Sequence, residues 1–116
     1  MTVDARAMVD RLYEALSRHD AKAVVELYAD DAVVVRHDGA VEGRDAIQGF
    51  WERYLDHNRP YELDHIVAFR HEHDIALWDA MITTEAGKLL TYDVAVLDDS
   101  GAITRHVPLI RGYWGL

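Results

Sequence analysis

The sequence predicts an α+β fold in which helices cover one face of an antiparallel sheet, and three observations support this prediction. Before Pro60, apolar residues recur mainly at the three- and four-residue spacing of helices. After Pro60, runs of alternating apolar and polar residues are separated by short turn clusters. With 116 residues, half of them hydrophobic, the chain is long enough for one hydrophobic core and little more. We therefore expect a single domain over residues 1–116.

Three helices are expected in the first half of the chain. The first runs from about residue 4 to residue 18, and its apolar side carries Met8, Leu12, Ala15 and Leu16. Asp20 is a suitable N-cap for a second helix that extends to Tyr28. After a short strand at residues 32–36, a third helix opens at Gly43 and stops before Pro60. The apolar side of this third helix carries Ile47, Phe50, Trp51, Tyr54 and Leu55.

Four strands are expected in the second half, and the last two of them bring two polar residues together. The four strands cover residues 61–69, 73–84, 89–97 and 102–111. If the turn cluster at residues 98–101 forms the loop, Asp93 lies directly opposite His106. Directly opposed side chains have Cβ atoms about 4.5–5.5 Å apart, which is close enough for a carboxylate and an imidazole to touch. The sequence therefore predicts an acid/base pair.

The same extrapolation sorts the other strand residues onto two faces. The face with the polar pair is expected to hold two rows, which are Leu63, Ala80, Asp93 and His106, then His65, Trp78, Ala95 and Thr104. The small side chains of Ala80 and Ala95 leave space beside the pair, as a pocket requires. The outer face is expected to carry an ion pair between Asp79 and Arg105 among the apolar residues Leu77, Met81, Tyr92, Val94, Val96, Ile103 and Val107. A second copy of the chain is the simplest cover for this face.

Composition excludes several classes of partner and site. The net charge of −9 disfavours nucleic acid and anionic membranes, and the absence of cysteine excludes disulfides and thiol catalysis. His71 and His73 flank a tight turn without an apparent third ligand, so no metal site is expected. No signal peptide and no apolar run of transmembrane length are apparent. We therefore expect a cytoplasmic protein.

Three segments, at residues 27–35 (LYADDAVVV), 42–47 (EGRDAI) and 101–106 (GAITRH), carry a family resemblance. The chain resembles the nuclear transport factor 2-like superfamily, in its polyketide cyclase (SnoaL-like) and ketosteroid isomerase branch. The resemblance implies a cone-shaped, curved sheet with three N-terminal-half helices on its concave face. It also implies a deep hydrophobic pocket between helices and sheet, and commonly a homodimer through the outer sheet face.

The resemblance carries over part of the catalytic set of the steroid isomerases. At the position of their general-base aspartate, after the first strand, this chain has Arg36. Their oxyanion-binding tyrosine of the first helix matches Leu12, with Tyr13 one step around the helix. Asp93 matches their second oxyanion-binding acid. One of the three groups is therefore retained.

Two further branches differ in how well they fit. The epoxide hydrolase branch needs an Arg/Asp pair on a middle strand, where this chain has Ala80 and Ile82. The cyclase branch uses an acid/base carboxylate or histidine in the same pocket, a role that Asp93 and His106 can fill.

Each candidate residue also has a structural interpretation. A polar pair such as Asp93 and His106 is often a structural hydrogen bond inside a sheet. Arg36 lies either on the surface at a strand end or in the cavity. His65 alternates with apolar residues, which is typical of a core histidine. Large aromatic residues usually pack in a core, a role compatible with lining a pocket, and this applies to Trp51, Tyr54 and Trp78.

We expect a cofactor-independent acid/base enzyme that acts on a small, largely apolar carbonyl compound. In this scheme His106 shuttles the proton, an ionised Asp93 accepts a hydrogen bond from its ring, and Arg36 or Tyr13 stabilises the enolate. The remaining substrate-binding candidates are Trp51, Tyr54, His65, Trp78, Ala80 and Ala95. Isomerisation, cyclisation and dehydration share this chemistry. The alternative is a non-catalytic ligand-binding or dimerisation module of the same fold.

Overall fold

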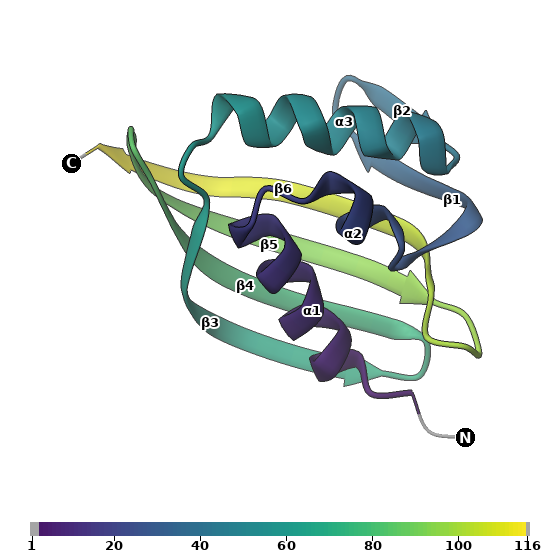
Figure 1. Ribbon diagram of the computed structural model, residues 1–116. Helices are drawn as coiled ribbons and strands as arrows, with labels where there is room; N and C mark the ends of the chain where they lie inside the picture. The colour runs from purple at the N-terminus through teal and green to yellow at the C-terminus, as the bar shows by residue number, and fades with distance from the viewer. Residues whose placement is uncertain (1–2, 116) are drawn as a thin grey trace.

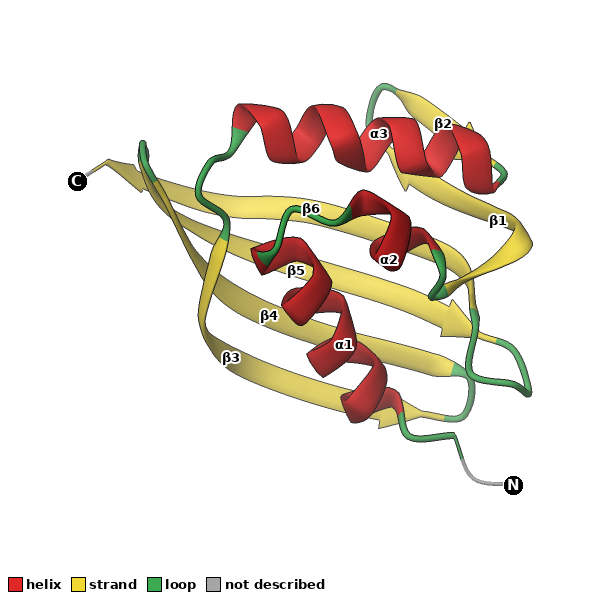
Figure 2. Ribbon diagram, in the orientation of Figure 1, coloured by secondary structure: helices red, strands yellow, loops and turns green. Residues whose placement is uncertain are grey.

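The computed structural model describes residues 3–115, and the described helices all lie on one side of a six-stranded sheet (Figure 1). The sheet curves around these helices and stays open, so its strands do not close into a barrel (Figure 2). In chain order the elements are α1 (Ala5–Ser17), α2 (Ala21–Val25), β1 (Tyr28–Arg36), β2 (Gly39–Glu42), α3 (Arg44–His57), β3 (Glu62–Glu72), β4 (Ile75–Thr84), β5 (Gly87–Leu97) and β6 (Ile103–Gly115). The α+β fold class predicted from the sequence is confirmed.

The strand order places the first strand beside the last one. The order is β2-β1-β6-β5-β4-β3, with β1 and β6 parallel and all other neighbours antiparallel. In the parallel pair, Tyr28 lies beside Ile103 and Val34 beside His106. β1 is longer than the strand expected at residues 32–36, and β2 was not predicted. The parallel pairing brings Tyr28 into the site described below.

The first two helices begin at aspartate N-caps, of which Asp20 was predicted. The side chains of Asp4 and Asp20 each accept a hydrogen bond from a backbone N–H three residues later, at 2.9 and 3.0 Å. α2 ends at Val25, earlier than expected, because Tyr28 already belongs to β1. At the start of α3, Arg44 donates two hydrogen bonds to the Tyr28 carbonyl, which tie this helix to β1. None of the described helices is long and apolar enough to cross a membrane.

The register between β5 and β6 differs by two residues from the expected one. The loop closes one residue later than expected and a bulge follows, so His106 lies opposite Ala95 and Asp93 opposite Pro108. Because the difference is two residues, Asp93 and His106 stay on the same face as diagonal neighbours. Ile103, expected on the outer face, is fully buried on the helix-covered face.

The register between β4 and β5 is also displaced by two residues. The two strands are joined by a tight turn that already pairs Thr84 with Gly87, instead of the expected four-residue loop. Trp78 therefore lies opposite Asp93, where Ala80 was expected. A large indole, rather than a methyl group, covers this side of the carboxylate.

The outer face of the sheet is apolar and only partly covered by the chain itself. The expected ion pair between Asp79 and Arg105 is wrong, because Asp79 instead pairs with Arg111 at 3.1 Å. The half-buried apolar side chains of this face are Leu77, Met81, Leu90, Tyr92, Val94, Val96 and Val107. We refer to these seven side chains as the outer apolar face.

Candidate active site

Asp93 and His106 touch beneath the helices. His106 Nε2 lies 2.7 Å from Asp93 Oδ2, and the two residues are 0% and 5% exposed. The imidazole is packed among aromatic rings, with ring centroids 6.3 Å away in Trp51 and 5.9 Å away in both Trp78 and Tyr28. A histidine so enclosed must have both ring nitrogens satisfied, because an unpaired buried polar group is costly.

The second ring nitrogen of His106 is occupied by a tyrosine. Tyr28 Oη lies 2.6 Å from His106 Nδ1, and the Trp51 indole N–H donates to the same hydroxyl at 3.2 Å. The expectation that one His106 nitrogen is free to act on a substrate is therefore wrong. Neither His106 nor Tyr28 lines the cavity described below.

One assignment of hydrogens gives every group in this chain of hydrogen bonds a partner. An indole can only donate, so one lone pair of the Tyr28 hydroxyl accepts from Trp51, and the hydroxyl hydrogen finds an acceptor when it is donated to His106 Nδ1. His106 then carries its hydrogen on Nε2 and donates it to Asp93. The chain therefore ends on an ionised, accepting Asp93. If Asp93 were protonated, or His106 doubly protonated, the Tyr28 hydroxyl hydrogen would find no acceptor among the described residues.

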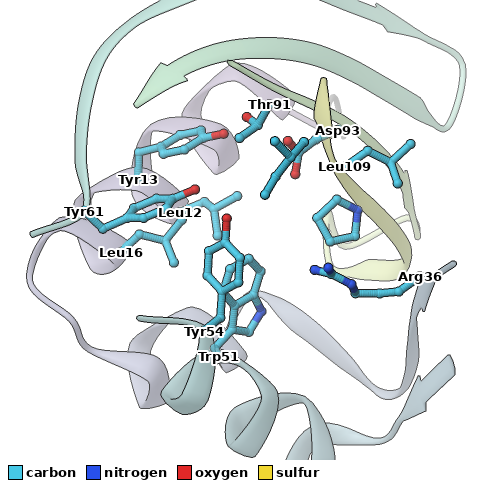
Figure 3. A pocket seen from close by; sticks show the side chains of 12 residues that line it. Leu12, Tyr13, Leu16, Arg36, Trp51, Tyr54, Tyr61, Thr91, Asp93 and Leu109 are labelled. Atoms are coloured by element: carbon cyan, nitrogen blue, oxygen red, sulfur yellow. The ribbon is translucent and has the colours of Figure 1, made fainter. Parts of the chain in front are cut away.

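A second tryptophan orients a second tyrosine. The Trp78 indole N–H donates to Tyr13 Oη at 2.9 Å. The hydroxyl accepts this bond through one of its lone pairs and keeps its own hydrogen as a donor, and Tyr13 lines the cavity described below. Figure 3 shows the Tyr13 hydroxyl on the same side of the cavity as Thr91 and Asp93.

The cavity itself is small and mostly apolar. It measures about 20 Å³, which is room for one or two water molecules. We call it the inner cavity, and its walls are Leu12, Tyr13, Leu16, Arg36, Trp51, Tyr54, Tyr61, Thr91, Asp93, Pro108, Leu109 and Ile110 (Figure 3). Asp93 is the acidic side chain in this wall, and Arg36 is the basic one.

Burial keeps the tyrosines around the inner cavity protonated. It raises the pKa of Tyr13 and of Tyr61 well above the ordinary tyrosine value, and the negative charge of Asp93 adds to the effect on Tyr13. Burial likewise raises the pKa of Tyr28 and of Tyr54. These phenols are therefore hydrogen-bond donors over the physiological pH range.

Arg36 lies in the cavity wall rather than only on the surface. It ends β1 and reaches back toward α3, where its guanidinium carbon lies 5.2 Å from the centre of the Phe50 ring. Figure 3 shows its side chain directed toward Tyr54 and Trp51, which also line the cavity.

Three of the other predicted substrate-binding residues lie away from the cavity wall. Ala80 and Ala95 are fully buried opposite Thr91 and His106, so the space expected beside them is filled. His65 is exposed, because irregularities in the pairing of β3 with β4 place it opposite Met81 on the other face. It is neither a core histidine nor a pocket residue.

Trp78 lies behind the cavity wall and does not line the cavity itself. It is 1% exposed and contacts the site through its bond to Tyr13 and its packing on His106.

Sequence reasoning missed two tyrosines of this site. Tyr28 was assigned to the end of a helix, and Tyr61 was treated only as the start of a strand. One signal for Tyr28 was its even spacing from Ala32 and Val34, because side chains an even number of residues apart on a strand face the same side. No cluster of three or more His, Cys, Asp or Glu side chains with metal-binding geometry occurs among the described residues.

Known structures share this fold. A SnoaL-like protein of unknown function from Burkholderia thailandensis has a TM-score of 0.79 at 16% identity, over 93% of this chain and 95% of that one. A provisionally named ketosteroid isomerase from Kribbella flavida has a TM-score of 0.77 at 15% identity, over 97% of this chain and 81% of that one. A provisionally named polyketide cyclase from Sinorhizobium meliloti has a TM-score of 0.76 at 22% identity, over 90% and 98%. At these identities the likeness establishes the fold alone.

The family follows from the match of the sequence to a protein-family model. No curated protein matches the chain in sequence. The SnoaL-like domain family matches residues 9–106, which is most of the chain. The SnoaL-like resemblance seen in the sequence is confirmed, and the chain belongs to the SnoaL-like domain family.

Proposed function

We propose that the protein is a cofactor-independent acid/base enzyme that moves a proton on a small, largely apolar carbonyl compound, with Asp93 as the base. One observation carries the proposal, namely that the chain of hydrogen bonds from Trp51 ends on the carboxyl group of Asp93 in the wall of a cavity. A purely structural hydrogen bond would not require that the last acceptor face a cavity.

The proposed roles follow from which groups reach the inner cavity. Asp93 takes a proton from the carbon next to the carbonyl group, and the Tyr13 hydroxyl donates a hydrogen bond to the oxygen on which negative charge develops. The proton on Asp93 is then returned to the substrate. His106 and Tyr28 are positioning residues, since they hold the carboxylate without touching the substrate. Isomerisation, cyclisation and dehydration all contain this step.

The test is exchange of substrate α-protons with solvent deuterium, followed by proton NMR over a panel of small aryl and alkyl ketones. We expect exchange above the buffer rate with the wild-type protein, and a loss of at least about 10²-fold in Asp93→Asn, the usual scale for losing a catalytic base. Asp79→Asn is the matched control, because this substitution makes the same chemical change at a residue on the outer face of the sheet. Normal exchange in Asp93→Asn would contradict the proposal.

A second candidate is a non-catalytic binding module of the same fold. The observation that favours it is the small inner cavity, whose volume of about 20 Å³ admits only the end of a ligand. A ligand that binds saturably at this site without any exchange of its α-protons would favour the binding module over the enzyme.

A further inference from the structure

A second, larger cavity adjoins the inner one. The groove between α3 and the β1–β2 hairpin has a volume of about 500 Å³, within the range of about 300–1,000 Å³ that is typical of small-molecule sites. Arg36 and Tyr54 line both this groove and the inner cavity, so the two spaces share a boundary. A substrate whose reacting end meets Asp93 therefore has room for the rest of its body in this outer groove.

One face of α3 forms a wall of the outer groove. The face carries Phe50, Arg53, Tyr54 and His57, at the i, i+3, i+4, i+7 spacing that aligns side chains along a helix. The rings of Phe50 and Tyr54 stack with centroids 6.0 Å apart. This wall offers a planar apolar surface next to a cation.

The outer groove carries two arginines without ion-pair partners among the described residues, in a chain that is acidic as a whole. The protein carries a net charge of −9, yet both Arg36 and Arg53 line the groove and neither forms an ion pair with a described residue. Most other arginines of the described chain do form such pairs. Asp38 also lines the groove, without an ion pair to either arginine. Two guanidinium groups are thus left with donors for an external anion.

The position of Arg36 suits it to hold that anion at the boundary. Its guanidinium is supported on the Phe50 ring, 5.2 Å from the ring centre, which leaves its N–H edge free for a planar acceptor. A guanidinium binds a carboxylate through two parallel hydrogen bonds. An anion held there lies in the outer groove, which Arg36 lines and Asp93 does not.

We infer that the substrate is an organic acid, whose carboxylate is bound by Arg36 and Arg53 in the outer groove while its carbonyl end enters the inner cavity. The inference rests on the proposed function, because it takes Asp93 as the reacting group. It adds an anion-binding site and a substrate class, namely small keto acids with an apolar body.

The test compares two probes that differ only in charge, 3-benzoylpropionate and 3-benzoylpropionamide. Titration of the ¹⁵N-labelled protein, followed by amide chemical shifts, gives both the affinity and the place of binding. We expect the acid to bind at least about tenfold more tightly than the amide, the scale of a charge-assisted hydrogen bond. Shifts should cluster on α3 and the β1–β2 hairpin, and the preference for the acid should fall at higher salt.

Three variants assign the preference to the two arginines. Arg36→Gln and Arg53→Gln should each reduce it, and the double variant should bind both probes equally. Arg11→Gln is the control, since Arg11 is exposed on α1 and does not line the groove. Equal affinity of the wild type for both probes, no saturable binding of the acid in the millimolar range, or a preference that survives the double variant would each overturn the inference.

The same probes separate this inference from the proposed function. If the wild type prefers the acid but exchanges no α-proton of any keto acid, the anion site stands and the acid/base function fails. If α-protons exchange through Asp93 without any preference for the acid, the function stands and the anion site fails.

Discussion

Replacing Tyr28 by Phe tests the hydrogen-bond chain at its centre. The Tyr28 hydroxyl accepts from Trp51 and donates to His106, and all three side chains are at most 3% exposed. Phenylalanine keeps the ring and removes both bonds. Two buried polar groups, the Trp51 N–H and His106 Nδ1, then lose their partners.

The expected cost follows from those two groups. Each buried donor or acceptor left without a partner costs about 1–3 kcal/mol, so the loss of two partners in Tyr28→Phe should lower the free energy of unfolding by about 2–6 kcal/mol. This is a large part of the total stability of a domain, which is usually about 5–15 kcal/mol. For a chain of this size, at about 4 °C per kcal/mol, it corresponds to a fall in Tm of about 8–24 °C.

The assay is equilibrium unfolding in urea, followed by tryptophan fluorescence and by circular dichroism. Tyr113→Phe is the control, because Tyr113 is 50% exposed and its change should stay within about 0.5 kcal/mol. A double-mutant cycle of Tyr28→Phe with His106→Leu should show a coupling of at least about 1 kcal/mol. If Tyr28→Phe behaves like Tyr113→Phe, the chain does not have the proposed role in stabilising the site.

Three further predictions concern packing, assembly and pH. Ala95→Leu should destabilise the fold by about 1–3 kcal/mol in urea unfolding, because Ala95 packs tightly opposite His106, and an unchanged stability would mean that a space exists there. The outer apolar face should pair with a second copy, so sedimentation at micromolar concentration should show a dimer that Val94→Glu dissociates, and a wild-type monomer would refute this. Burial raises the pKa of Tyr13, Tyr28 and Tyr61 in the folded protein above the unfolded value of about 10, so their contribution to stability is fully present below about pH 10. Above about pH 10 the free energy of unfolding should fall by about 1.4 kcal/mol per pH unit for each tyrosine that stays protonated in the folded state. Urea unfolding between pH 9 and 11 measures this loss, and flat stability would contradict the burial of Tyr13, Tyr28 and Tyr61.

The sequence was sufficient to place Asp93 and His106 on one face, although the predicted register was wrong. A loop that closed one residue later and a bulge each moved the pairing by one residue in the same sense. The side-chain direction alternates with a period of two, so the two displacements together restored the face. The contact between Asp93 and His106 therefore exists on a diagonal rather than directly across the ladder.

The rest of the site depends on pairings that local sequence does not encode. Tyr28 reaches His106 because β1 pairs in parallel with β6, and a parallel pairing leaves no signal in a connecting turn. His65 was placed on the wrong face because irregularities within β3 reverse the alternation there. The position of Trp78 opposite Asp93 depends on the length of one turn, which has two residues instead of the four predicted.

The central claim is that every hydrogen bond between Trp51 and Asp93 is donated in the same direction, so that the chain of bonds ends on an ionised Asp93. The protonation state of the His106 ring, measured by ¹⁵N NMR at neutral pH, tests it without any knowledge of the substrate. The account predicts a neutral ring with its hydrogen on Nε2 and a bare Nδ1 that accepts from Tyr28. A hydrogen on Nδ1, whether alone or together with one on Nε2, would contradict it, because Tyr28 would then be an acceptor only and Asp93 would lose its assigned place as the end of the chain.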